Sequence, residues 1–368
     1  MKPLLAEIRR NPLLWLLICV PAVFAAHSMK PEAHTLHFLL SLGAIVPLAA
    51  LLSHATESVA SKTGDAVGGL LNATLGNLTE LVIALAALRA GEYLLVKASV
   101  AGAIVANTLF MLGASFLLGG LKHHTQEYNR VSARLQAGLL FLATIALLVP
   151  SAVVEADAGA GTAAAAFSEK LSVGLSILLI GAYALGMLFS LKTHREFFGS
   201  ASHGDGEDEE PWPIGLALAT LAGVTVLVAL VSEVFVESVQ EAAKTFGMTP
   251  AFVGFIVVAL VGGAAEMASA FSGARKDRLD LSVGIALGSA SQIALFVAPV
   301  LVLLSYVIGP APMSLQFWPG AVVMMLIATL TASLATNSGR SAWFIGVLVL
   351  MVYLIFAMTL YLLPPATA

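Results

Sequence analysis

The chain has 368 residues, of which 59% are hydrophobic and 11% are charged, and its mean hydropathy is +0.93. So few charges cannot cover the surface of a water-soluble protein of this size, and the composition therefore predicts an integral membrane protein. The net charge of −4 gives no support to nucleic-acid binding, and the single Cys19 excludes an intrachain disulfide.

Apolar runs long enough to cross a bilayer follow one another along the whole chain. The first run follows Arg9 and Arg10 and resembles a signal peptide. We expect a retained helix instead, because its removal would strip the basic segment that fixes the topology. The eleven predicted spans lie near residues 13–29, 36–54, 66–90, 94–120, 131–153, 170–191, 213–237, 249–274, 279–307, 313–336 and 341–363.

Lysine and arginine are unevenly divided between the two sides of this predicted bundle. Thirteen of the 18 fall on the side of the N-terminus, which predicts a cytoplasmic N-terminus; with eleven spans, the C-terminus then lies outside. The five basic residues on the other side are Lys30, Arg89, Lys97, Lys170 and Lys244.

One acidic stretch, Ser202 to Pro211, interrupts the apolar pattern. We interpret it as a solvated cytoplasmic linker, with a cation-attracting patch at a cytoplasmic mouth as the alternative. It divides the chain into an N-terminal helix (1–33), a first five-helix repeat (34–199), the linker (200–212) and a second five-helix repeat (213–368). The predicted fold is an all-α polytopic membrane protein with about 11 transmembrane helices.

Two glutamates occupy matching places in the two repeats. Glu80 follows Gly76 and Asn77 near the middle of the third span, and Glu266 follows Gly262 and Gly263 in the eighth. A carboxylate at bilayer depth costs several kcal/mol unless it is protonated or holds a cation, so such residues are functional candidates. The two spans run in opposite directions, which predicts inverted repeats whose glutamates meet at the midplane and form one site. A protonated structural glutamate is the alternative.

Further polar residues repeat between the halves. An amide follows each glutamate in the next span, at Asn107 and at Gln292, where the alternative role is interhelical hydrogen bonding. Ser289 is a weaker candidate, for which packing is favoured. Glu57 and Glu237 each lie where an apolar helix turns amphipathic, and we consider them candidate gate or relay residues, with a wet helix face as the alternative.

The motifs resemble those of the calcium/cation antiporter superfamily, and within it the calcium/proton exchangers. The segment from Gly68 to Leu81, GGLLNATLGNLTEL, resembles the first signature of that family. The second signature of the family resembles the segment from Phe252 to Glu266, together with Gly288-Ser289 and the segment QIALFVAP that starts at Gln292. The resemblance implies eleven helices, an acidic linker and Ca²⁺/H⁺ antiport. This chain departs from the family at Gly263, where Asn is usual, and at Met267, where His is usual.

A buried carboxylate pair gives such exchange a physical basis. Desolvation and mutual repulsion favour at least one proton on the empty pair, whereas a divalent cation stabilises both charges. Cation and protons then compete for one site, and we expect the proton gradient to drive Ca²⁺ export. The expected ligands are Glu80, Glu266, Asn77 and backbone carbonyls beside Gly76, Gly262 and Gly263, with water completing the shell.

Other functions can be compared with this prediction. The first alternative is a Na⁺/H⁺ or K⁺/H⁺ antiporter on the same scaffold, since Gly263 removes one side-chain oxygen. An intramembrane enzyme is a distant third, because the sequence contains neither a phosphate-binding Gly-x-x-x-x-Gly-Lys-Ser/Thr motif nor His-Glu-x-x-His. We expect no cofactor, and the partners are the transported ions and the lipid bilayer. The short tail favours a bacterial inner membrane.

Overall fold

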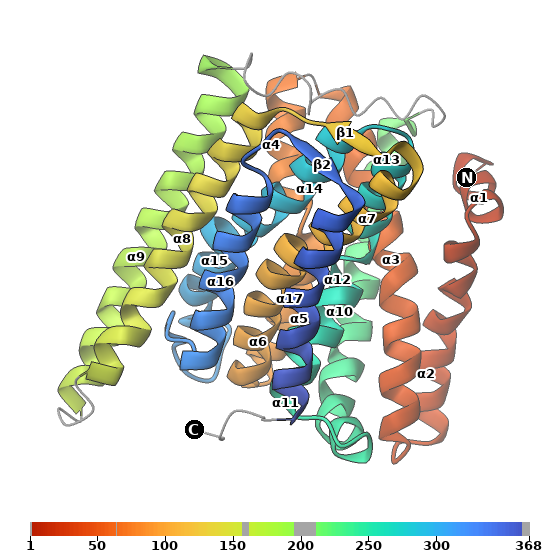
Figure 1. Cartoon of the computed structure of the whole chain (residues 1–368). Helices are drawn as coiled ribbons and strands as arrows, with labels where there is room; N and C mark the ends of the chain where they lie inside the picture. Colours follow the sequence, from red (N-terminus) through yellow and green to blue (C-terminus); the bar gives the residue numbers. More distant parts are fainter. Residues whose placement is uncertain (1, 64, 157–161, 195–210, 363–368) are drawn as a thin grey trace.

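The computed structural model describes residues 2–63, 65–156, 162–194 and 211–362. Most of these residues are helical, and the helices form one bundle whose long axes run in a common direction (Figure 1). Most of the acidic linker, residues 200–210, lies outside the described residues.

The N-terminal segment contains α1 (Lys2–Arg10), the 3-10 turn η1 (Pro12–Ile18) and α2 (Cys19–Met29). Asn11 separates α1 from η1, because its side chain accepts a hydrogen bond from the backbone N–H of Leu13 and Pro12 starts the next helical turn. η1 and α2 pack on α3 and form the first predicted span.

The first half of the bundle follows from residue 34. Several of its helices change locally to wider π-helical turns, which often mark functional segments. Its elements are α3 (His34–Lys62), α4 (Asp65–Leu75), α5 (Leu78–Arg89), α6 (Tyr93–Val105), η2 (Ala106–Met111), α7 (Leu112–His123), β1 (Thr125–Glu127), α8 (Arg130–Ala156), α9 (Thr162–Leu188) and η3 (Phe189–Thr193).

The second half repeats the arrangement, again with π-helical turns, at η5 and η6. Its elements are α10 (Ile214–Thr245), α11 (Pro250–Phe252), η5 (Val253–Val258), α12 (Ala259–Gly262), α13 (Ala264–Arg275), α14 (Leu279–Gln292), η6 (Ile293–Val297), α15 (Ala298–Ser305), α16 (Pro319–Ala335), β2 (Arg340–Ala342) and α17 (Trp343–Leu362).

The observed helices match the predicted membrane spans, apart from local differences. Among the described residues, eight helices are long and apolar enough to span a bilayer, and the bent pair Pro250–Gly262 and Ala264–Arg275 provides a ninth candidate. The pair α4–α5 and the 17-residue α16 cover the two remaining predicted spans. The predicted helices over 66–90 and 249–274 are each interrupted, because the backbone leaves helical geometry at Asn77 and Gly263. The span predicted from 313 begins only at Pro319.

A short antiparallel ribbon, which the sequence did not predict, marks one end of the bundle. β1 pairs with β2 through Gln126 and Ser341, and we call this end the ribbon face. In Figure 1, α4 and α13 lie toward the ribbon face, whereas α11 and the last residues of α17 lie toward the other end, here called the opposite face. The path α4–α5 therefore runs away from the ribbon face and α11–α13 runs toward it, as inverted repeats require.

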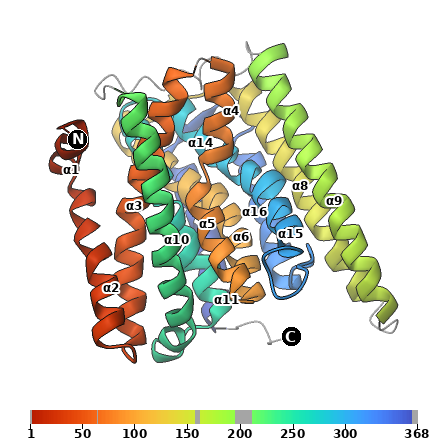
Figure 2. The same ribbon diagram turned by 180° about the vertical axis from the view of Figure 1, so that it is seen from behind.

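The longest helices flank this central group. α3 and α10 lie side by side along one flank, and α8 and α9 form a pair on the other (Figures 1 and 2). The side chains that α9 and α17 expose include Ile177, Leu178 and Leu348, as expected for surfaces in contact with lipid tails. The two broken helices are enclosed between these flanks.

Candidate functional site

Both glutamates stand in the first turn of a helix that starts at a break. Glu80 lies in the first turn of α5 and Glu266 in the first turn of α13. In the second half the two helical segments meet at 58°. Backbone N–H groups at a helix start carry partial positive charge, which stabilises a carboxylate there. Both side chains are partly exposed.

The two halves cross at this point, so that each glutamate lies beside a glycine of the other half. A Cβ atom at Gly262 would lie 3.2 Å from Cγ and 3.7 Å from Oε1 of Glu80. A Cβ atom at Gly76 would lie 3.8 Å from Oε1 of Glu266. The structure therefore places each of the two glutamates at the break of the other half.

Asn77, Ser289 and Gln292 connect the break of the first half to the second half. The Asn77 amide donates to Oε1 of Gln292 at 2.6 Å, and the Ser289 hydroxyl lies 2.6 Å from Oδ1 of Asn77 and 2.5 Å from Oε2 of Glu266. Ser289 has one hydrogen and can donate to only one of these acceptors. In this amide orientation, both contacts form hydrogen bonds only when Glu266 carries a proton and donates it to Ser289. Ser289 therefore contacts both Asn77 and Glu266, whereas the sequence favoured a packing role for it.

The second half lacks the equivalent amide. Asn107 is 1% exposed, and its Nδ2 group has no hydrogen-bond partner. Its Oδ1 lies 3.6 Å from the position that a Cβ of Gly263 would take, and the Met267 methyl group lies 3.4 Å from the same position. Asn107 therefore faces the place where a side chain at position 263 would stand, whereas Gln292 has Asn77 as its partner.

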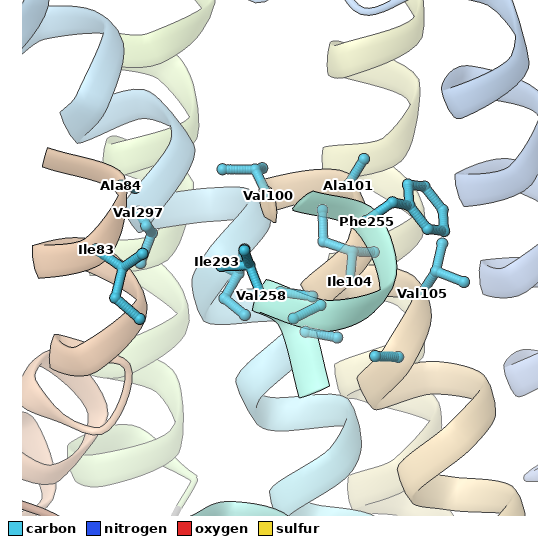
Figure 3. Close-up of a cluster of buried hydrophobic side chains, with 14 of the residues drawn as sticks. Ile83, Ala84, Val100, Ala101, Ile104, Val105, Phe255, Val258, Ile293 and Val297 are labelled. Atoms are coloured by element: carbon cyan, nitrogen blue, oxygen red, sulfur yellow. The ribbon is translucent and has the colours of Figure 1, made fainter. Parts of the chain in front are cut away.

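An apolar cluster lies on the side of the site toward the opposite face. Figure 3 shows side chains of α5, α6, η5 and η6 pointing toward one another. In α5 and η5 these side chains lie between the helix break and the opposite face. In α6 and η6 they lie between the amide residue, Asn107 or Gln292, and the opposite face. A pocket beside Glu80 is bounded mainly by these groups. Its lining residues are Glu80, Ala84, Ser99, Val100, Ala103, Val258, Ala259, Ile293 and Val297.

The two gate candidates lie on α3 and α10. Glu57 is exposed on α3 and accepts a hydrogen bond from Ser53 at 3.2 Å. Glu237 is exposed on α10, one turn beyond Glu233, which pairs with Arg89 at the end of α5 at 3.1 Å. Both residues are exposed on their helices, and a gate or relay role stays a prediction for each.

The donor set consists of two carboxylates with amides, a hydroxyl and backbone groups. The described residues contain no cluster of three or more His, Cys, Asp or Glu side chains suited to a resident metal. Sequence reasoning missed Ser99, which lines the pocket at Glu80. Its only signal is a hydroxyl in an apolar helix, and many packing serines share that signal.

Comparison with known proteins identifies the family of this chain. The model of the sodium/calcium exchanger protein family matches residues 33–192 and 216–362. The chain is 39% identical to a Ca²⁺/H⁺ antiporter of Synechocystis over 95% of this chain and 96% of that protein. It is 41% identical to the Ca²⁺/H⁺ antiporter ChaA of Bacillus subtilis over 87% of this chain and 90% of that protein.

Solved structures show the same fold. The structure of native YfkE superposes with a TM-score of 0.82 at 36% identity, covering 96% of this chain and all of YfkE. The H⁺/Ca²⁺ exchanger CAX superposes with a TM-score of 0.70 at 17% identity over 96% of this chain and 92% of CAX. Two family matches that include both broken helices, together with relatives of nearly equal length, show that this chain belongs to the sodium/calcium exchanger protein family.

Proposed function

We propose that this protein is a secondary active transporter that exchanges Ca²⁺ for H⁺ by alternating access. The observation that carries the proposal is the crossed arrangement of Glu80 beside Gly262 and Glu266 beside Gly76. Relatives that are named Ca²⁺/H⁺ antiporters and match nearly the whole chain support the choice of ions.

The exchange follows from competition at one carboxylate pair. A divalent cation placed between Glu80 and Glu266 neutralises both charges, whereas protons neutralise them in its absence. The hydrogen bonds of Ser289 with Asn77 and Glu266 describe the proton-loaded arrangement. Calcium binding removes the proton from Glu266 and turns the oxygens of this network toward the ion.

The ligand shell would combine both halves of the site. Ca²⁺ takes six to eight oxygens, which carboxylates, amides, carbonyls and water can supply. Glu80, Glu266 and Oδ1 of Asn77 are the side-chain ligands that we propose, with carbonyls freed at Gly76 and Gly262. Asn107, Gln292 and Ser289 hold this shell in place or reach it through water.

The side of the site from which ions enter is part of this proposal. Apolar side chains gather on the side toward the opposite face, and Glu80 and Glu266 are partly exposed, which supports access from the other side. We infer access from the ribbon face, which the distribution of Lys and Arg places in the cytoplasm. Glu57 lies at that entrance and would pass ions or protons to Glu266. In a bacterial inner membrane, with the C-terminus outside, inward proton flow would drive Ca²⁺ export.

Gly263 gives a second candidate function. Because position 263 supplies no side-chain oxygen, fewer ligands are fixed in the second half of the site, which weakens the preference for an ion that needs six to eight oxygens. Na⁺/H⁺ or K⁺/H⁺ exchange on the same carboxylates is therefore the alternative.

Proton flux into proteoliposomes that contain the purified protein would test the proposal. A pH gradient is imposed, and Ca²⁺, Na⁺ or K⁺ is added separately while internal pH is followed with a fluorescent dye. We expect Ca²⁺ to release protons, and we expect Glu80→Gln and Glu266→Gln each to abolish the response. Glu233→Gln is the matched control, because Glu233 forms an exposed ion pair of small energetic value. A response to monovalent ions alone would reject Ca²⁺ as the substrate, and transport by either site variant would reject the shared site.

A further inference from the structure

The helix α1 lies outside the transport bundle at the ribbon face. Its main packing partner is η1, and Figure 1 shows it at the edge of the molecule, apart from the broken helices. The Trp15 indole N–H donates to the backbone carbonyl of Ile8 at 3.1 Å and ties α1 to η1. The proposed transport mechanism assigns α1 no role.

The sequence of α1 is amphipathic. At 100° per residue, Leu4, Leu5 and Ile8 fall on one arc about 100° wide. Leu4 and Ile8 pack against the apolar core, whereas the Leu5 side chain, at the edge of the arc, is 56% exposed. Arg9 and Arg10 are exposed in the last turn, and Arg9 neighbours Leu5 on the helix surface. One edge of α1 therefore presents an apolar group beside a cation.

The chain geometry places this edge at the boundary of the bilayer. The first membrane span begins at Pro12, separated from α1 by Asn11 alone. A helix of 9 residues is about 14 Å long and cannot cross roughly 30 Å of hydrocarbon. Trp15, 63% exposed in the first turn of the span, suits the headgroup region, where tryptophan is enriched.

We propose that α1 is an interfacial helix that inserts Leu5 among the lipid tails and binds the phosphates of anionic lipids through Arg9 and Arg10. The apolar edge accounts for membrane contact, and the two guanidinium groups account for a preference for negative headgroups. This inference requires only that the protein is in a membrane, so it stands or fails separately from the transported ion.

Depth measurements on the full-length protein test this proposal. In a Cys19→Ser background, a fluorophore is attached at Leu5→Cys or, on the polar side of the helix, at Glu7→Cys. The protein is reconstituted into phosphatidylcholine vesicles with or without phosphatidylglycerol. Quenching by acrylamide reports exposure to water, and quenching by brominated lipid reports insertion. Size-exclusion profiles verify that each variant is folded.

In vesicles with phosphatidylglycerol, we expect the label at position 5 to be quenched by lipid and the label at position 7 by acrylamide. Arg9→Gln/Arg10→Gln should lower the ratio of inserted to free α1 by roughly fivefold per arginine, and omission of phosphatidylglycerol should have a similar effect. The control Lys62→Gln/Lys276→Gln removes two exposed charges from the same face but outside α1, and should change nothing. Equal acrylamide quenching at positions 5 and 7 would overturn the proposal. Insertion that ignores both phosphatidylglycerol and the arginines would overturn the headgroup assignment.

Discussion

Glu80 and Glu266 each follow a break in a helix, but the segments that precede the two breaks are packed differently. On the ribbon face, α4 packs mainly on α3 and η3. Its counterpart toward the opposite face, the segment from α11 through α12, packs closely on α6, where Gly102 faces the backbone of Phe255. One structural unit thus occurs in a loosely packed and in a closely packed setting within one molecule.

The difference is instructive because transport requires the two halves to exchange these settings. In an inverted repeat, the closed packing of one half describes the packing that the other half adopts when access reverses. The same comparison exposes a chemical inequality, since Asn77 bonds to Gln292 while Gly263 leaves the Asn107 amide without a partner. Three sets of substitutions test these differences in packing and in chemistry between the two halves.

The largest effect is expected at the break glycines. A Cβ atom at Gly76 would lie 2.7 Å from the backbone carbonyl oxygen of Asn72, which cannot yield without moving the helix, whereas a Cβ at Gly262 meets the flexible Glu80 side chain at 3.2 Å. Gly76→Ala should reduce the transport rate about 100-fold, because a helix shift that misplaces a ligand by about 1 Å costs roughly that factor. Gly262→Ala should reduce the rate only about tenfold, because the flexible Glu80 side chain can move aside. Initial rates of Ca²⁺-driven proton release measure both. Equal losses would show that the two breaks tolerate a methyl group equally.

A smaller effect is expected at Ser289. Ser289→Ala removes the hydroxyl that bonds to Asn77 and to protonated Glu266, and the loss of one hydrogen bond between neutral groups costs about 1 kcal/mol. This loss falls on the proton-loaded state, so protons compete less well and the apparent affinity for Ca²⁺ at fixed pH should rise about fivefold. Ser291→Ala is the control, because the Ser291 hydroxyl bonds to the backbone carbonyls of Leu287 and Gln136. If Ser291→Ala changes the affinity as much as Ser289→Ala does, the effect belongs to α14 as a whole.

The smallest effect is expected from restoring an amide at the second break. Gly263→Asn would offer Asn107 a hydrogen-bond partner and add one oxygen to the site, at the cost of displacing the Met267 methyl group. The preference for Ca²⁺ over Na⁺ should rise about threefold, which corresponds to a fraction of one net hydrogen bond. Competition of Na⁺ with Ca²⁺-driven proton release provides the readout. The double variant Gly263→Asn/Met267→Ala relieves the crowding, and an unchanged ratio there would show that position 263 does not set selectivity.

The helices and the candidate glutamates could be predicted from the sequence, because apolar length and charge are local properties of the chain. Glu80 and Glu266 are charges inside apolar runs, and the opposite directions of the two runs predicted that they approach each other. The breaks were not predicted, since residues 66–90 read as one continuous apolar helix. The bridging role of Ser289 depends on the approach of α14 to Asn77, a contact between residues 212 positions apart that no local pattern encodes. The ribbon likewise depends on pairing two distant loops.

The loops at the ribbon face restrict which helices can move. The Gln126 amide donates to the carbonyl oxygen of Ala274 at 3.0 Å and to Asp277 at 2.8 Å, and the Lys122 ammonium donates to the carbonyl oxygen of Arg275 at 2.8 Å. These bonds fasten the end of α13 to the connection between α7 and α8. We therefore expect α13 to belong to a stationary frame, with α4 and α3 swinging against it as the ion changes sides.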